Sequence, residues 1–200
     1  MTNTNVELSK NELELVINSQ FILTKNRIIE KVYKLFGLLS EDYKKILENY
    51  ATNLPADIFS LPPKIYKGEN YLGLPYVMMD HPRFFLKDDA FAIRSFFWWG
   101  NYFSTTLQLS GSFFQAFRNK IGQNLKANAE EDYFVCINNT PWEHNFKESN
   151  YKPLKNIDTI EEILNKPFIK IATKHPLQQW NNAEEFFKLN YEKFLKLLVV

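Results

Sequence analysis

A Gly-Asn pair at positions 100–101 most constrains how this chain can fold, because it separates two aromatic, β-prone runs. A two-residue connection that begins with glycine is typical of a β-hairpin, since glycine adopts the positive φ that tight hairpin turns need. The segments 91–99 and 102–110 are therefore predicted to pair as antiparallel strands. With a two-residue turn, Trp99 lies opposite Tyr102, and this pairing fixes the register of the whole hairpin.

This register predicts which side chains share each face of the hairpin, since successive side chains of a strand point to opposite faces. One predicted face carries a single charge, Arg94, in surroundings that are otherwise mostly apolar. The other predicted face mixes aromatic residues with serine, threonine and glutamine. The two faces are Trp98, Phe103, Phe96, Thr105, Arg94, Leu107, Ala92 and Leu109, and Trp99, Tyr102, Phe97, Ser104, Ser95, Thr106, Ile93 and Gln108.

A guanidinium group on an apolar face needs a partner, because an unpaired buried charge destabilises a protein strongly. The planar fork of arginine matches a carboxylate or a phosphate through two hydrogen bonds. One hypothesis is an anion-binding pocket in which Arg94 anchors the ligand and Phe96 and Trp98 form the walls. The alternatives are a side chain that extends to the sheet edge and an internal ion pair. The carboxylates considered for such a pair are Asp80, Asp88 and Asp89.

Helical periodicity and capping patterns dominate the first fifty residues. Ser9 and Glu12 have the spacing of a capping box, which predicts a helix start. A second helix is expected from about 26 to 36, where Gly37 ends it. A third helix is expected to begin after Ser40.

A length of 200 residues fits a single domain. We expect a helical N-terminal part (1–51), an irregular, proline-containing connection (52–70), and a part with the sheet and further helices (71–200). The predicted class is α+β, with a largely antiparallel sheet of about five strands and helices packed on one face. A turn at His81-Pro82 is expected after the first strand. The expected strands are 72–79, 91–99, 102–110, 133–138 and 168–173.

Composition excludes several kinds of partner and cofactor. The net charge is +1 and the charges are interspersed, so nucleic acid is not expected as a partner. No segment approaches the ~20 apolar residues of a membrane span, and the first fifteen residues lack the pattern of a signal peptide. The chain is therefore expected in the cytoplasm, without a membrane partner. No glycine-rich nucleotide motif occurs, so no cofactor is predicted.

The cysteine and histidines do not follow metal-binding patterns. Cys136 is the only cysteine, which excludes an intrachain disulfide. His81, His144 and His175 lie near expected strand ends, but their spacing matches no known metal motif, so no metal site is predicted.

Three hypotheses for function follow from these residues. The first is a domain that binds a small anionic or aromatic molecule, in a pocket bounded by the hairpin, the 52–70 connection and the strand ends near Asp80 and His144. The second is a protein-interaction or homodimerising module that uses the hairpin tip and the apolar C-terminal helix. The third is an enzyme with acid/base or metal-binding groups, in which no catalytic role is assigned to any one residue. The ligand-binding candidates are Arg94, Phe96, Trp98, Asp80, His81 and Arg83; the interaction candidates are Trp99 and Tyr102; the enzyme candidates are Asp80, His81, Arg83 and His144.

Overall fold

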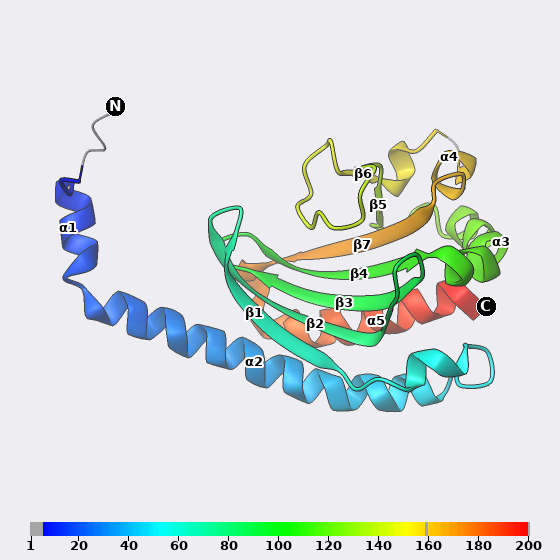
Figure 1. Cartoon of the computed structure of the whole chain (residues 1–200), viewed down its shortest axis with the longest axis horizontal. Coiled ribbons are helices and arrows are strands. Elements are labelled where there is room, and N and C mark those ends of the chain that lie inside the picture. Colours follow the sequence, from blue (N-terminus) through cyan, green and yellow to red (C-terminus); the bar gives the residue numbers. More distant parts are fainter. Residues whose placement is uncertain (1–5, 159, 200) are drawn as a thin grey trace.

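The computed structural model describes residues 6–158 and 160–199. One prediction touches positions outside the described residues: the absence of a signal peptide, which involves the first five residues. The chain has the predicted α+β class, with helices packed on one face of a curved antiparallel sheet (Figure 1). The sheet has seven strands rather than the five or so predicted.

The strand order across the sheet is β1-β2-β3-β4-β7-β5-β6, and the paired strands are antiparallel. Short 3₁₀ helices span Ala56–Phe59, Leu154–Asn156 and Leu177–Asn182. The other elements are α1 (Lys10–Val16), α2 (Ser19–Glu48), β1 (Lys64–Tyr71), β2 (Leu74–Phe85), β3 (Ala90–Trp98), β4 (Tyr102–Ser110), α3 (Gly111–Ala127), β5 (Phe134–Cys136), β6 (Tyr151–Pro153), α4 (Ile160–Leu164), β7 (Phe168–Pro176) and α5 (Ala183–Val199).

The central hairpin forms as β3 and β4, but its turn contains three residues rather than two. Trp98, not Trp99, pairs with Tyr102, and the amide of Asn101 donates a hydrogen bond to the carbonyl oxygen of Trp98 (3.0 Å). Gly100 has a φ of +71°, which explains why glycine stands in this turn. The predicted register was therefore wrong by one residue. Every β4 side chain consequently lies on the face opposite to the predicted one.

The observed register divides the hairpin into an apolar face and a mixed face. Phe97 and Phe103 pair across the hairpin on the apolar face, which packs against the helices as part of the main core. Arg94 lies on the other face, opposite Thr106 and near Ser104. The prediction that Arg94 lies on an apolar face was therefore wrong. It lies among polar side chains at the middle of the sheet.

Helix α2 is continuous through the region where two helices were predicted. Gly37 does not end the helix, and Ser40 does not cap a new one: its hydroxyl donates to the Gly37 carbonyl oxygen (2.7 Å). A mid-helix glycine costs roughly 1 kcal/mol, which is less than burying one large apolar side chain contributes. Many such side chains are buried along one stripe of α2: Ile29, Val32, Phe36, Leu39, Tyr43 and Leu47.

The β1–β2 side of the sheet contains more strand than the sequence predicted. Strand β1 was not predicted and begins within the connection 52–70 that was expected to be irregular, and β2 continues past the turn expected at 81–82. A shift in the β2–β3 register between Asp80 and Arg83 accommodates an extra residue. Because such a bulge reverses the alternation of side chains, Arg83 lies on the same face as Asp80 although three positions separate them.

Replacing Gly37 with alanine should stabilise the protein by about 1 kcal/mol, because glycine disfavours a helix interior by roughly that amount. A Cβ atom at this position would meet no atom within 4 Å. Denaturant unfolding measures the change. The control is Gly100→Ala, which should destabilise the protein because alanine disfavours the positive φ found there. Unchanged or lower stability of the Gly37 variant would contradict a continuous α2.

Candidate functional site

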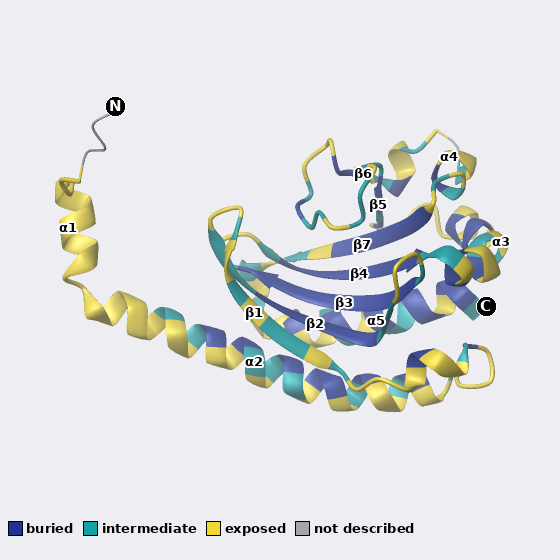
Figure 2. Ribbon diagram, viewed as in Figure 1, coloured by how far each residue is buried: buried dark blue, intermediate teal, exposed yellow. Residues whose placement is uncertain are grey.

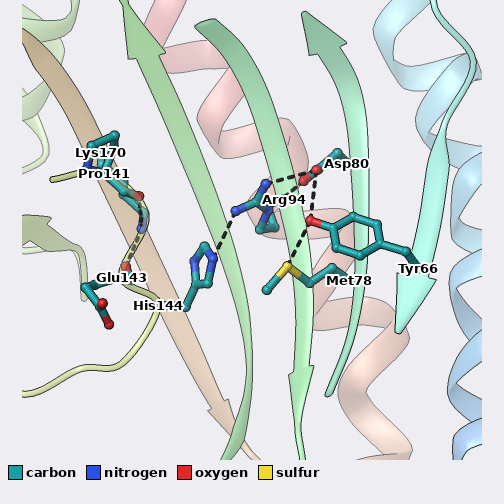
Figure 3. Close-up of polar contacts among 8 residues, drawn as sticks. All are labelled: Tyr66, Met78, Asp80, Arg94, Pro141, Glu143, His144 and Lys170. Carbon is teal, nitrogen blue, oxygen red and sulfur yellow. Dashed lines mark hydrogen bonds and ion pairs between the residues drawn. The ribbon is translucent and has the colours of Figure 1, made fainter. Parts of the chain in front are cut away.

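The centre of the helix-free face of the sheet holds an ion pair between Arg94 of β3 and Asp80 of β2 (Figure 3). Arg94 Nε donates to Asp80 Oδ1 (2.7 Å), and Nη2 donates to Oδ2 (2.9 Å). The two side chains are 8% and 5% exposed, respectively. Among the alternatives for Arg94, the structure therefore contains the internal ion pair, and Asp80 is the carboxylate that forms it.

Strand pairing places these two residues directly opposite each other, so their side chains meet without any loop movement. Burial alone would favour an uncharged Arg94, but the neighbouring Asp80 carboxylate outweighs this effect and raises the pKa of the guanidinium. Arg94 is accordingly cationic, and a carboxylate inside the protein already balances its charge.

A third hydrogen bond connects Arg94 to the β5–β6 loop, which comprises residues 137–150. Arg94 Nη1 lies 3.2 Å from His144 Nε2, and Figure 3 shows the imidazole approaching the guanidinium from the side opposite Tyr66. A guanidinium can only donate, so His144 Nε2 accepts and the ring is neutral. Burial, with the positive charges of Arg94 and Lys170 adding to it, lowers the pKa of His144 and favours this neutral form.

Lys170 of β7 holds the same loop through its backbone. Its Nζ donates to the carbonyl oxygens of Pro141 (2.7 Å) and Glu143 (2.5 Å), and it lies 5.5 Å from the centre of the Tyr151 ring. Burial, together with the charge of Arg94, lowers the pKa of Lys170 to about 7. Sequence reasoning missed this residue, because a single lysine in a strand carries no local signal of burial.

Tyr71, at the end of β1, holds the loop from the other side of the face. Its hydroxyl oxygen accepts hydrogen bonds from the amides of His144 (2.7 Å) and Asn145 (2.9 Å), and the hydroxyl donates to Glu143 Oε2 (3.2 Å). The loop is thus hydrogen-bonded to β1, β3 and β7, three strands that are distant in sequence.

Phe96 and Trp98 lie on the same face as Arg94 but do not line an open pocket beside it. Both are buried in an aromatic cluster, where the Phe96 ring lies 5.9 Å from Tyr71 and 5.5 Å from His144. Trp98 Nε1 donates to the carbonyl oxygen of Tyr71 (3.2 Å). These two residues therefore support the β5–β6 loop rather than a cavity.

A pocket of about 210 Å³ opens beside the ion pair, towards β1. Its lining contains three cationic side chains, three aromatic rings and a single carboxylate. Of the predicted ligand-binding residues, the structure brings Asp80, Arg83 and Arg94 together here. The lining residues are Lys64, Tyr66, Asp80, Arg83, Phe85, Arg94 and Trp142.

Tyr66 and Arg83 are oriented by hydrogen bonds around this pocket. Tyr66 Oη lies 3.4 Å from Asp80 Oδ2 and 3.1 Å from Met78 Sδ, and burial raises the pKa of Tyr66 to about 12. The phenol is therefore a neutral donor to the carboxylate. Arg83 Nε donates to the carbonyl oxygen of Pro62 (2.9 Å), which belongs to the connection predicted to border the site.

His81 does not join the pocket. It faces the helices, where its ring lies parallel to Tyr191 at 6.5 Å between ring centres. Neither ring nitrogen has a hydrogen-bond partner among the described residues. The proposed enzyme grouping of Asp80, His81, Arg83 and His144 is consequently divided between the two faces of the sheet.

The surfaces considered for protein interaction are mostly covered within the chain. Trp99 and Tyr102 are half-buried, and Tyr102 Oη donates to the carbonyl oxygen of His144 (3.3 Å). The apolar end of α5 packs into the core, where Leu197 and Leu198 are each 2% exposed.

Within residues 6–158 and 160–199, no group of three or more histidine, cysteine or acidic side chains is placed to hold a metal ion. The described helices include none with both the length and the apolarity needed to cross a bilayer.

Removing both partners of the buried ion pair should cost less stability than the sum of the losses caused by removing each partner alone. Arg94→Met, which leaves Asp80 buried and unpaired, should destabilise the protein by about 3–5 kcal/mol. In the double variant Asp80→Leu/Arg94→Met the loss should be clearly smaller than the sum of the two single losses. Denaturant unfolding of the four proteins measures this coupling. Additive losses would show that the pair contributes no interaction of its own.

The stability of the protein should fall as the pH falls from about 6.5 to about 4, because of His81. Burial, with the charges of Lys44 and Arg83 adding to it, lowers the pKa of His81 from 6.5 to about 4. In this window the unfolded chain takes up a proton that the folded chain does not, which costs up to roughly 3 kcal/mol. His144 acts in the same direction.

The variant His81→Leu should therefore lose less stability than the unmodified protein between neutral pH and pH of about 5. Urea unfolding at both pH values gives the comparison. The difference between the two proteins at neutral pH isolates the packing effect of the substitution. An equal loss in both proteins would remove His81 as a source of the acid sensitivity.

Comparisons with known proteins found no match for the chain among family models, curated proteins or solved structures.

Proposed function

We propose that the protein binds a small anionic aromatic molecule, of the aromatic carboxylate class, in the pocket beside the Arg94–Asp80 pair. One observation carries the proposal: the pocket lining has three cationic side chains but only one carboxylate. Since Asp80 balances Arg94, the excess positive charge comes from Lys64 and Arg83. An anionic group would balance that charge.

Arg83 suits the recognition of a carboxylate. Its Nε donates to the carbonyl oxygen of Pro62, and this hydrogen bond fixes the plane of the guanidinium. A guanidinium held in one orientation loses less conformational entropy when it binds an anion. Lys64 supplies a second, more mobile charge from β1, with its Nζ 5.6 Å from the centre of the Tyr66 ring.

The aromatic rings of the pocket favour a flat ligand. The Phe85 and Trp142 rings lie 6.2 Å apart at an angle of 40°, and Trp142 is 58% exposed. Aromatic pairs stabilise contacts by offset or edge-to-face packing. The pocket is smaller than the roughly 300–1,000 Å³ of sites for drug-sized ligands, so it suits a molecule with one ring. The proposal places this binding in the cytoplasm, as the sequence predicts.

The remaining hypotheses have less support from the geometry. An interaction surface at Trp99 and Tyr102 would have to use side chains that are already half-buried. An enzyme that combined His81 with Asp80 would have to act across the sheet, because His81 contacts the helices.

Benzoate should bind to the protein, and its neutral analogue benzamide should bind more weakly, since the proposed site recognises charge. Lys64→Met and Arg83→Met should each weaken benzoate binding about tenfold or more, because each removes one charge-assisted contact. Isothermal titration calorimetry gives the affinities, and the change in tryptophan fluorescence on binding, to which the exposed Trp142 contributes, gives an independent signal.

The matched control is Lys67→Met, on the same strand but with its Nζ 5.8 Å from the ring of Tyr33 on α2. This substitution changes the net charge equally and should leave the affinity unchanged. The proposal fails if benzoate does not bind, or if Lys67→Met weakens binding as much as Lys64→Met does.

A further inference from the structure

The N-terminal arm, defined as residues 6–24, projects beyond the sheet and is exposed at every residue (Figures 1 and 2). It comprises α1 and the first turns of α2. Large apolar side chains are concentrated on it, with exposures between 47% and 87%. They are Val6, Leu8, Leu13, Leu15, Val16, Ile17, Phe21, Ile22 and Leu23.

The sequence specifies this arm as helix. Ser9 and Glu12 form the predicted capping box at the start of α1, and the Asn18 side chain accepts the Phe21 amide at the start of α2 (3.2 Å). Ile22 lies two helical turns before Ile29, on the stripe that α2 buries against the sheet. The apolar stripe thus continues past the point where the sheet stops covering it.

We propose that a second copy of the chain covers the arm, so that two arms pair and form a homodimer. The nine exposed apolar residues present on the order of 800 Å² of surface, which is about the area that each partner contributes to a standard stable interface. Nine large apolar side chains this exposed on one segment are unusual for a monomeric protein, whose surface usually carries apolar patches of only a few hundred Å². The arm is a different surface from the ligand pocket, which lies beside the Arg94–Asp80 pair.

The charges near the arm favour an antiparallel pairing of two identical chains. Helix α1 contains Glu12 and Glu14 and one lysine, so its net charge is negative. The part of α2 that follows the arm, residues 25–31, contains Lys25, Arg27, Lys31 and one glutamate. Lys25 pairs with Glu69 of β1, and the remaining charges still sum to a positive value. In a two-fold symmetric, antiparallel pair, α1 of one copy lies along this part of the other copy. Opposite charges then meet twice, as a symmetric interface requires.

A groove at the base of the arm provides a place for the partner's α1. It has a volume of about 570 Å³ and lies between α2 and β1, at the edge of the sheet. Its lining includes the apolar surfaces of Ile29 and Tyr33, surrounded by one lysine and two glutamates, so the groove offers apolar contact rather than positive charge. The lining residues are Asn26, Ile29, Glu30, Tyr33, Lys67 and Glu69.

The charge of α1 argues against a lipid surface as the occupant. Helices that lie on membranes carry lysine and arginine on their polar face, because anionic lipids attract them. The polar positions of α1 instead include Glu12 and Glu14. These carboxylates favour the basic part of a second α2.

Sedimentation velocity of the full chain over a wide range of concentration tests the proposal. The unmodified chain should form dimers, and Phe21→Ser/Ile22→Ser should weaken the association roughly a hundredfold or more, since each dimer loses four apolar side chains. Both residues are about half exposed in the single chain, so circular dichroism should show an unchanged fold. The control is Leu38→Ser/Leu189→Ser, which removes side chains of similar exposure (57% and 52%) away from the arm and should not change the association.

A charge-reversal pair tests the antiparallel arrangement. Glu14→Lys alone and Arg27→Glu alone should each dimerise more weakly than the unmodified chain. A mixture of the two variants should form mixed dimers more strongly than either variant pairs with itself, because both contacts between positions 14 and 27 again join opposite charges.

Two results would overturn the proposal. One is an unmodified chain that stays monomeric at every concentration. The other is a monomer that binds vesicles of anionic phospholipid and loses this binding in Phe21→Ser/Ile22→Ser, because the arm would then serve a membrane surface.

Discussion

The buried charge of Arg94 determines much of what surrounds it. A guanidinium removed from water requires partners for its donors, and the chain supplies them from two directions. Asp80 comes from the neighbouring strand, and His144 comes from the β5–β6 loop. Arg94 is therefore one of the groups that tie the loop to the sheet, together with Lys170 and Tyr71. Trp142, which lines the pocket beside β1, belongs to this loop.

The two faces of the sheet are stabilised by different kinds of interaction. The helix side is an apolar core, in which the aromatic residues of β3 and β4 pack against α2, α3 and α5. The opposite side combines aromatic packing with directed hydrogen bonds from Tyr71, Arg94 and Lys170. Apolar packing tolerates small shifts, whereas hydrogen bonds at these distances define one geometry. Specific recognition of a ligand is better placed on the second face.

Features encoded by a few neighbouring residues were predicted from the sequence. The α+β class, the helix start at Ser9 and Glu12 and the existence of the 91–110 hairpin were all correct. The register was not, because the same Gly-Asn pair fits a two-residue and a three-residue turn. Only the packing of the whole sheet decides between them. The continuity of α2 through Gly37 likewise depends on residues that the helix meets only after folding.

The candidate site was likewise predicted only where neighbouring residues carried the signal. Arg94 and Asp80 were recognisable because a charge in an apolar run is a local anomaly. Arg83 was also a candidate because it is close to Asp80 in the sequence. That it lies on the same face as Asp80 depends on a bulge, which no residue pattern predicts. Lys64 and Tyr66 were hidden because the prolines before β1 suggested an irregular segment. Lys170 was missed because its carbonyl partners come from a loop almost thirty positions away.

The length of α2 has a consequence for how rigidly its N-terminal end is held relative to the sheet. Its thirty residues extend about 45 Å at 1.5 Å per residue, and its buried residues begin at Ile29. The helix is therefore anchored over its later turns and free over its earlier ones, with no break between the two parts. Bending it at the junction would require breaking consecutive backbone hydrogen bonds. Any molecule attached to the free end is consequently held at a nearly fixed orientation to the sheet.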